Sequence, residues 1–349
     1  MPVAETSDKH YLTYLAVLTT YSGGSAAPTA LGVRHRDRTP AGTLRGVSGR
    51  FAPSPTGPLH LGNLRTALVA WLAARSEGRA FLVRMEDLDP VTSSRVVEQL
   101  QLDDLAALGL DWDGDPVRQS ERFDLYRAAI EELAARDLVY PCYCSRREIQ
   151  QAAAAPHGEP APDGAYPGTC RHLDRAGQAA HEERGRRPAL RLRAQVDHET
   201  VVDALAGTFT GVVDDVVVQR NDGVPAYNLA VVVDDHHQGV TQVVRGDDLL
   251  SSTPRQVHLQ RLLGYSSPEY AHVPLALGPD GTRLAKRHGA VTMADLTTRG
   301  VGPQQIVALL GASLGLCGRD DAVDASLLRG WFRLSGLPRE PWRPDLDTV

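Results

Sequence analysis

Residues 49–68 read G-R-F-A-P-S-P-T-G-P-L-H-L-G-N-L-R-T-A-L, and this stretch decides the fold. Its residues 50–52 are typical of the end of a strand, and the prolines and glycine that follow force a loop. Apolar side chains then recur at helical spacing over residues 64–74. The pattern predicts a strand–loop–helix unit whose helix begins at Gly62 or Asn63.

Two features of this unit favour binding of an anion. Backbone N–H groups at a helix start, together with the helix dipole, attract phosphate. His60 can donate a hydrogen bond to the same phosphate, and Gly62 lets a flat base or a backbone come close. An ordinary strand-to-helix turn with a partly buried histidine would explain His60 and Gly62 alone, but the whole string is far more specific.

Acidic residues follow a second apolar strand, which the pattern predicts over Ala80–Met85. In open α/β sheets ligands bind beyond the carboxyl ends of the strands, so Glu86 is well placed to bind an ammonium group. A helix-capping acidic turn is the alternative. It suits Asp89, which precedes Pro90 and a helix expected from about residue 93 to residue 108.

The apolar pattern resumes in the second half of the chain. Residues 225–235 are predicted to form a buried helix or strand, and residues 240–253 a strand that ends at Arg245, then a turn and a helix. Further on, residues 278–290 form a loop with Lys286 and two arginines, here called the lysine loop. Such a loop can close over a triphosphate, whereas a basic surface hairpin is the plain alternative.

Three of the four cysteines cluster, which points to a metal site in a reducing compartment and not to a disulfide scaffold. Cys142 and Cys144 stand one residue apart, and Cys170 follows downstream. Thiolates favour tetrahedral zinc. Three buried thiols without a metal are the alternative, and Cys317, far along the chain, is predicted to be a core residue.

Composition indicates a folded chain with two domains, or with one domain that carries an insertion. The 349 residues are 42% hydrophobic, and the net charge of −6 does not by itself indicate a nucleic-acid partner. The densest basic stretch, residues 184–193, is either a solvated face or a phosphate-binding patch. No apolar run reaches the roughly 18 residues that span a bilayer. Residues 1–46 are interpreted as a disordered leader or a start-site artefact, with a secretory signal as the alternative.

The motifs and their order resemble those of class I glutamyl-tRNA synthetases, over roughly residues 48–297. The matching strings are R-F-A-P-S-P-T-G-P-L-H-L-G, R-M-E-D-L-D, A-Y-N-L-A-V-V-V-D-D, V-V-R-G-D-D and R-L-A-K-R-H-G-A. The resemblance implies an α/β fold with a class I synthetase Rossmann-like parallel sheet, an inserted zinc-containing, acceptor-binding-like domain and a short helical C-terminal segment. It also implies ATP with Mg²⁺, and L-glutamate as the amino acid.

The resemblance gives each matching residue a role. ATP would be bound by His60, Gly62, Asn63 and Lys286, and His60, Gly62 and Lys286 would act in catalysis. Glutamate would be bound by Arg50, Phe51, Ala52, Pro53, Ser54, Glu86, Tyr227 and Arg245. Of these, the arginines would hold the carboxylates and Glu86 the ammonium. One structural zinc would be held by Cys142, Cys144, Tyr166 and Cys170, with His172 or His157 as alternatives to Tyr166.

Two positions of the lysine loop depart from the family pattern, because Arg283 and Ala285 stand where that pattern has lysine and serine. Charge is kept and a hydroxyl is lost, which leaves the kinetics of the loop open. Leu249 replaces a larger residue that some relatives have near the adenosine. We expect altered packing there without loss of activity.

Chain length favours the truncated branch of this family, which transfers glutamate to the queuosine base in the anticodon of tRNA(Asp). Only 63 residues follow Lys286, too few for a helical anticodon-reading domain. The expected parts are a disordered leader (1–46), a first Rossmann half (47–112), an inserted zinc-binding domain (113–224), a second Rossmann half with the lysine loop (225–296), and a short helical C-terminal segment without an anticodon-binding domain (297–349).

The expected partners are ATP, L-glutamate and queuosine-containing tRNA(Asp), for a monomeric cytoplasmic enzyme that binds no membrane. A minimal glutamyl-tRNA synthetase that acylates the tRNA 3′ end is one alternative, and a non-catalytic binding paralogue is another. A small-molecule nucleotidyltransferase of the same superfamily is a third, but it leaves R-F-A-P-S-P-T-G unexplained.

Overall fold

The decisive stretch forms the strand, loop and helix that its pattern predicts. In the computed structural model, which describes residues 47–153, 165–278, 280–282, 284 and 291–345, β1 spans Ser48–Phe51 and α2 spans Leu61–Ser76. The helix begins slightly earlier than predicted, because His60 is its N-cap. The second strand, β2 (Ala80–Met85), has the predicted bounds.

Seven strands form the main sheet, in the order β3-β2-β1-β9-β10-β6-β7. The remaining strands of this sheet are β3 (Val117–Arg118), β6 (His198–Asp203), β7 (Gly207–Val212), β9 (Val240–Gly246) and β10 (Glu269–Val273). All neighbours pair in parallel except β6 with β7, which form an antiparallel hairpin at the edge. The Rossmann-like parallel sheet that the sequence predicts is therefore confirmed.

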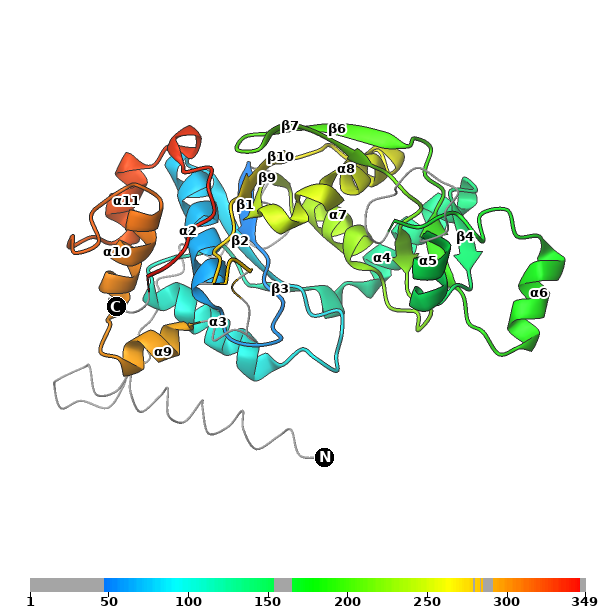
Figure 1. The fold of residues 1–349 in the computed structure, drawn as a ribbon, viewed down its shortest axis with the longest axis horizontal. Coiled ribbons are helices and arrows are strands. Elements are labelled where there is room, and N and C mark those ends of the chain that lie inside the picture. The colour runs from blue at the N-terminus through cyan, green and yellow to red at the C-terminus, as the bar shows by residue number, and fades with distance from the viewer. Residues whose placement is uncertain (1–46, 154–164, 279, 283, 285–290, 346–349) are drawn as a thin grey trace.

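The central parallel strands are buried on both faces, as expected for a parallel sheet. On β2, Phe81, Val83 and Met85 belong to one core cluster, and Leu82 belongs to another on the opposite face. The first cluster is built around α2, and Figure 1 shows α10 (Pro303–Ser313) and α11 (Ala325–Trp331) beside that helix. Residues 225–235, left open between helix and strand, form most of α7 (Tyr227–His237).

The region between the two halves of the sheet contains a smaller antiparallel sheet, in the order β4-β5-β8. Its strands are β4 (Val139–Cys142), β5 (Ala189–Leu192) and β8 (Val217–Gln219). The helices around it and on the main sheet are α3 (Arg95–Ala107), α4 (Phe123–Ala135), α5 (Arg146–Ala153), α6 (Arg175–Glu183), α8 (Thr253–Leu262) and α9 (Met293–Thr298). Figure 1 shows α5 and α6 beside this small sheet, at the far end of the molecule from α10 and α11.

The β6–β7 hairpin links this middle region to the main sheet. It lies within the range 113–224 that the sequence assigns to an inserted domain, yet β6 pairs with β10 of the main sheet. The division into five parts remains a prediction. Whatever its boundaries, residues 198–212 extend the main sheet.

Asp89 does not cap the helix that follows it, so that prediction is wrong. The N-cap of α3 is Ser94, and the carboxylate of Asp89 accepts a hydrogen bond from the amide of Val91 inside the preceding turn. Within the part of the chain that the structure describes, no helix combines the length and apolar character needed to cross a membrane.

Candidate active site

A cavity of about 530 Å³ opens where the strand order reverses. The chain runs from β1 toward β2 on one side, whereas β9 and β10 lie on the other. In parallel sheets this switch point, beyond the carboxyl ends of the strands, is the usual place for a ligand. The residues that end β1 and β9 line the cavity, among them Phe51, Arg245 and Gly246.

The structure brings together most of the residues that the sequence singles out. Those lining the cavity are Arg50, Phe51, Ala52, Pro53, Ser54, His60, Gly62, Asn63, Glu86, Tyr227 and Arg245. Leu249 lines it too. Lys286, Arg283 and Ala285 lie outside the described residues, as do His157 and the leader. The roles assigned to all of these residues remain predictions.

His60 uses its ring to cap its own helix. Its Nδ1 accepts hydrogen bonds from the amides of Gly62 and Asn63 at 3.1 and 3.3 Å, and the amide of Leu61 donates to Val291. The amides expected to face phosphate are therefore engaged within the protein. Because Nδ1 is an acceptor, the ring proton belongs to Nε2, which makes the histidine a donor.

Gly62 lies close to the His60 ring and to Ala276. A Cβ at this position would lie 3.0 Å from Cε1 of His60 and 3.2 Å from the Cβ of Ala276. A side chain at this position would require the His60 ring or Ala276 to shift by a few tenths of an ångström. The glycine thus serves the histidine geometry as well as leaving room in the cavity.

Arg245 is buried with one nitrogen left for a ligand. Its side chain donates to Nε2 of His272 at 3.0 Å and to the hydroxyl of Thr253 at 2.8 Å. Among the described residues none accepts a hydrogen bond from Nη1, although this atom is buried. An unpaired guanidinium nitrogen in a buried site calls for an acceptor such as a carboxylate.

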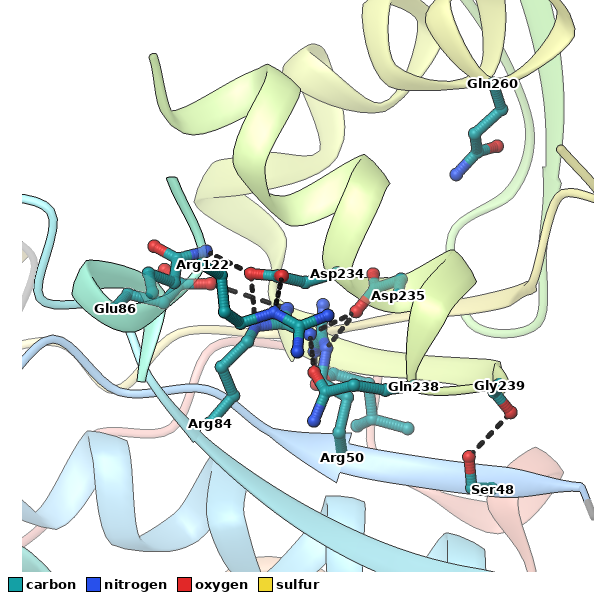
Figure 2. Close-up of polar contacts among 12 residues, drawn as sticks. Ser48, Arg50, Arg84, Glu86, Arg122, Asp234, Asp235, Gln238, Gly239 and Gln260 are labelled. Carbon is teal, nitrogen blue, oxygen red and sulfur yellow. Dashed lines mark hydrogen bonds and ion pairs between the residues drawn. The ribbon is translucent and has the colours of Figure 1, made fainter. Parts of the chain in front are cut away.

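Arg50 and Glu86 belong to one buried ion network (Figure 2). The carboxylate of Asp235 accepts from Arg50 at 3.4 Å and from Arg84 at 2.7 Å. Arg84 in turn lies 3.6 Å from Glu86. Burial alone would raise the pKa of Asp235, but the two guanidinium groups outweigh burial and lower it. The charged carboxylate of Asp235 therefore holds Arg50 directly, and holds Glu86 indirectly through Arg84.

Asp234 belongs to the same network (Figure 2). It is fully buried and accepts from Arg122 at 2.6 Å, from Tyr126 at 2.7 Å and from Gln119 at 2.9 Å. Arg84 approaches it to 3.7 Å. Because Asp234 and Asp235 both lie in the last turn of α7, ion pairs join this helix to residues of the first half of the sheet.

Gln101 is a site residue that the sequence did not reveal. Its amide donates to the carbonyls of Ser54 and Gly57 at 3.1 and 2.8 Å, so that α3 holds the proline-rich loop in place. The amide of Glu86 donates to Pro53, which fixes that loop to β2 as well. The available signal was its position, four residues before Leu105 and seven before Leu108, on the apolar face of the predicted helix.

Three thiols lie together in the middle region. All four cysteines are free thiols, and the Sγ atoms of Cys142, Cys144 and Cys170 lie within 4.8 Å of one another. The hydroxyl of Tyr166 is 3.3 Å from the first and 3.7 Å from the second. No histidine nitrogen of the described residues joins this group, and His172 is exposed. Three soft donors at this spacing fit zinc, and Tyr166 as fourth ligand remains a prediction.

We expect the purified chain to contain one zinc ion that depends on this cluster. A Cys144→Ser variant should lose the metal, because a hydroxyl is a poor zinc ligand. A Cys317→Ser variant is the matched control, since Cys317 packs against the main core and should leave the metal in place. Metal content by atomic emission measures both, and zinc retained in full by Cys144→Ser would contradict the assignment.

A second, larger groove adjoins the cavity and extends to the thiol cluster. Ser54, Thr56, Glu86 and Tyr227 line both spaces. Its other walls carry arginines, namely Arg146, Arg186, Arg187, Arg191 and Arg220. The groove therefore joins the cavity to a cationic surface.

The basic stretch 184–193 divides between the interior and this surface. Arg191 is buried with its guanidinium 3.7 Å from the centre of the Tyr166 ring, and Arg193 lies over Tyr140. These two guanidinium groups therefore make cation–π contacts with tyrosines beside the thiol cluster. Of the exposed members, Arg186 pairs with Glu148 and Arg187 faces the groove.

Comparison with known proteins agrees with this architecture. A family model described as tRNA synthetases class I (E and Q), catalytic domain, matches residues 46–318. The glutamyl-Q tRNA(Asp) synthetase of Nocardia farcinica is 59% identical over 85% of this chain and 93% of its own length. The protein of that name from Symbiobacterium thermophilum is 47% identical over 87% of this chain and 97% of its own length.

A solved structure is similar as well. The glutamate tRNA ligase of Elizabethkingia meningosepticum, in complex with its amino acid, matches with a TM-score of 0.73 and 28% identity, over 86% of this chain and 68% of that one. Fold, site and sequence thus agree. The chain belongs to the class I tRNA synthetases of the glutamate and glutamine family, and within them to the glutamyl-Q tRNA(Asp) synthetase branch.

Proposed function

We propose that the chain activates L-glutamate with ATP as glutamyl-adenylate and transfers the glutamyl group to the queuosine base of tRNA(Asp). Its family supports a glutamate–tRNA ligase-like activity. The observation that carries the proposal is a cavity lined both by Arg245, whose buried Nη1 has no acceptor among the described residues, and by Glu86. The choice of queuosine rests on the names of the relatives.

The amino acid would be held by charge on three sides. Arg50 and Arg245 supply cations for the two carboxylates of glutamate, and Glu86 supplies the anion for its ammonium. A site that offers a guanidinium to each of two carboxylates disfavours glutamine, because the side-chain amide gives one of them a neutral partner in place of an anion. Tyr227, half-buried beside both cavities, would close the pocket on the groove side.

ATP would lie along the start of α2. His60 offers the proton on Nε2 to a phosphate oxygen, and Gly62 leaves space for the base. Mg²⁺ bound with ATP, and Lys286 of the lysine loop, would neutralise charge on the departing pyrophosphate. We assign no nucleophile to the protein, so catalysis would rest on positioning and electrostatics.

Two transfers complete the reaction. A carboxylate oxygen of glutamate attacks the α-phosphorus of ATP in line, the bond to the bridging oxygen breaks, and pyrophosphate leaves. A hydroxyl of the queuosine cyclopentenediol then attacks the activated carbonyl, loses its proton and displaces AMP. The zinc, held away from the cavity by the thiol cluster, would support the fold of the middle region.

Glu86 should make activation sensitive to acid. Burial raises the pKa of this carboxyl above that of an ordinary glutamate, and Arg84 offsets only part of the shift. Protonation removes the anion that pairs with the ammonium, so kcat/KM for glutamate should fall as pH is lowered through this raised pKa. A Glu86→Gln variant should have a low and pH-independent kcat/KM. A wild-type profile as flat as that of the variant would contradict this role.

The arginine-lined groove is proposed as the path of the tRNA. Phosphate contacts position nucleic acid, and Arg187 is exposed on this surface. Arg187→Glu should weaken tRNA binding roughly 10-fold at low salt, since one phosphate contact becomes a repulsion, while adenylate formation stays unchanged. Arg127→Glu, on the exposed face of α4 outside the groove, is the control. Loss of both activities in Arg187→Glu would count against a purely RNA-binding role.

Glutamate-dependent ATP–pyrophosphate exchange tests the first half of the proposal. Exchange with glutamate and not with glutamine or aspartate is the expected result. Absence of exchange, with and without tRNA, would favour a non-catalytic binding paralogue. Acylation of a tRNA 3′ end would favour the minimal glutamyl-tRNA synthetase.

A further inference from the structure

Arg245 is held by a chain of buried hydrogen bonds that lies behind the cavity. Its Nε donates to Nε2 of His272 at 3.0 Å, and Nδ1 of the same ring lies 2.6 Å from Oδ2 of Asp203. The side chains of His272 and Asp203 are both fully buried. The three residues come from β9, β10 and the end of β6, and neither Asp203 nor His272 is among the residues that line the cavity.

Only one tautomer of His272 satisfies both neighbours. A carboxylate accepts and a guanidinium donates, so Nδ1 must carry the proton and Nε2 must offer its lone pair. Burial lowers the pKa of His272, which keeps the ring neutral at neutral pH. Burial acts against ionisation of Asp203, but hydrogen bonds from His272 and from backbone amides outweigh it and lower the pKa of this carboxyl.

We propose that Asp203 and His272 position Arg245: Asp203 selects the tautomer of His272, and His272 orients the guanidinium so that Nη1 faces the cavity. The proposal rests on the proposed function, because it takes Arg245 as an anchor of a substrate carboxylate. Asp203 and His272 are positioning residues, since neither lines the cavity.

Thr253 completes the support of the guanidinium. Its hydroxyl accepts from Nη2 of Arg245 at 2.8 Å. The same hydroxyl lies 3.1 Å from Nε2 of His272 and 3.2 Å from the carbonyl of Leu249, and both of these can accept its proton when Nδ1 carries the ring proton. With Nε and Nη2 engaged, the planar fork of the arginine has a fixed direction. The β6–β7 hairpin therefore supports the amino-acid pocket from outside it, because Asp203 ends β6.

The two oxygens of Asp203 have separate partners, which permits a clean substitution. Oδ1 accepts from the amides of Leu205, Ala206 and His272, whereas Oδ2 contacts only the ring among the contacts that the structure describes. In Asp203→Asn the three amide contacts can persist. The new Nδ2 must donate to Nδ1, which moves the ring proton to Nε2, directly against the donating Nε of Arg245.

Asp203→Asn is therefore expected to raise KM for glutamate roughly 10- to 100-fold, because the hydrogen bond from the charged Arg245 to His272 would be lost. The KM for ATP should change little in glutamate-dependent ATP–pyrophosphate exchange. Equal changes in both KM values, or an unchanged KM for glutamate, would overturn the proposal.

A pair of amide substitutions at His272 separates positioning from simple packing. The side-chain amide of His272→Gln reaches the place of Nε2 and can accept from Arg245. That of His272→Asn reaches only the place of Nδ1 and can bond only Asp203. Positioning predicts a lower KM for glutamate in the Gln variant than in the Asn variant. If His272 served only to bind Asp203, the Asn variant would have the lower KM for glutamate, and that result would contradict the proposal.

The tautomer itself can be measured without any substrate. ¹⁵N imidazole shifts of the wild-type chain, assigned by the signal that disappears in His272→Gln, should show a neutral ring protonated on Nδ1. In Asp203→Asn the proton should move to Nε2. A wild-type ring protonated on Nε2 would overturn the proposal even if glutamate is activated. Absence of exchange in the wild type, with the expected tautomer, would instead overturn only the proposed function.

Discussion

Replacing Asp234 with alanine is expected to lower the free energy of unfolding by about 3–5 kcal/mol, the usual cost of breaking a buried ion pair. The substitution would leave Arg122, Tyr126 and Gln119 without their common acceptor, and would remove a carboxylate beside the fully buried Arg84 (Figure 2). Urea denaturation of the metal-loaded chain measures the change.

A matched control for this substitution lies on α4. Asp124 is 89% exposed and pairs with Arg127 one helical turn away, so Asp124→Ala should change stability by less than about 1 kcal/mol. Both substitutions delete one carboxylate that contacts an arginine. A loss of stability as small in Asp234→Ala as in Asp124→Ala would show that the buried network does not hold the two halves of the sheet together.

Replacing Arg245 with alanine is expected to reduce kcat/KM for glutamate by roughly 10²- to 10³-fold, because truncating one partner of a buried charge pair costs about 2–5 kcal/mol. The loss should appear in ATP–pyrophosphate exchange at subsaturating glutamate. The buried Nη1 of this residue has no acceptor among the described residues, so the variant would remove the group that we propose binds a carboxylate of glutamate.

Arg127→Ala is the control for that experiment, since its arginine is 63% exposed and outside the cavity. Unfolding of the Arg245→Ala variant by urea should show whether the chain still folds. A folded Arg245→Ala variant that activates glutamate within threefold of the wild type would contradict the assignment of the amino-acid pocket.

Local patterns allowed the sheet and much of the cavity to be predicted from the sequence. The short apolar run Ala80–Met85 fixed β2 at its observed bounds, and the rule that ligands lie beyond strand ends placed Glu86 and Arg245 near one another. The spacing of Cys142, Cys144 and Cys170 likewise predicted a cluster that the structure contains. Each of these inferences depends on residues close in sequence or on a parallel strand order.

The parts that could not be predicted depend on contacts between distant segments. Asp203 and His272 are 69 residues apart and meet only because β6 pairs with β10. Helical periodicity does not reveal that the two carboxylates in the last turn of α7 have arginine partners on other elements. The inward orientation of Arg191 likewise follows from its stacking on Tyr166, which no charge count shows.

The most direct test of the proposed function is transfer of labelled glutamate, with ATP, to tRNA(Asp) that contains or lacks queuosine. We expect label only on the queuosine-containing tRNA, and we expect it to survive removal of the 3′ terminus, because the acceptor would be the anticodon base. Labelling of unmodified tRNA(Glu) at its 3′ end would contradict the proposal and assign the chain the activity of a minimal glutamyl-tRNA synthetase.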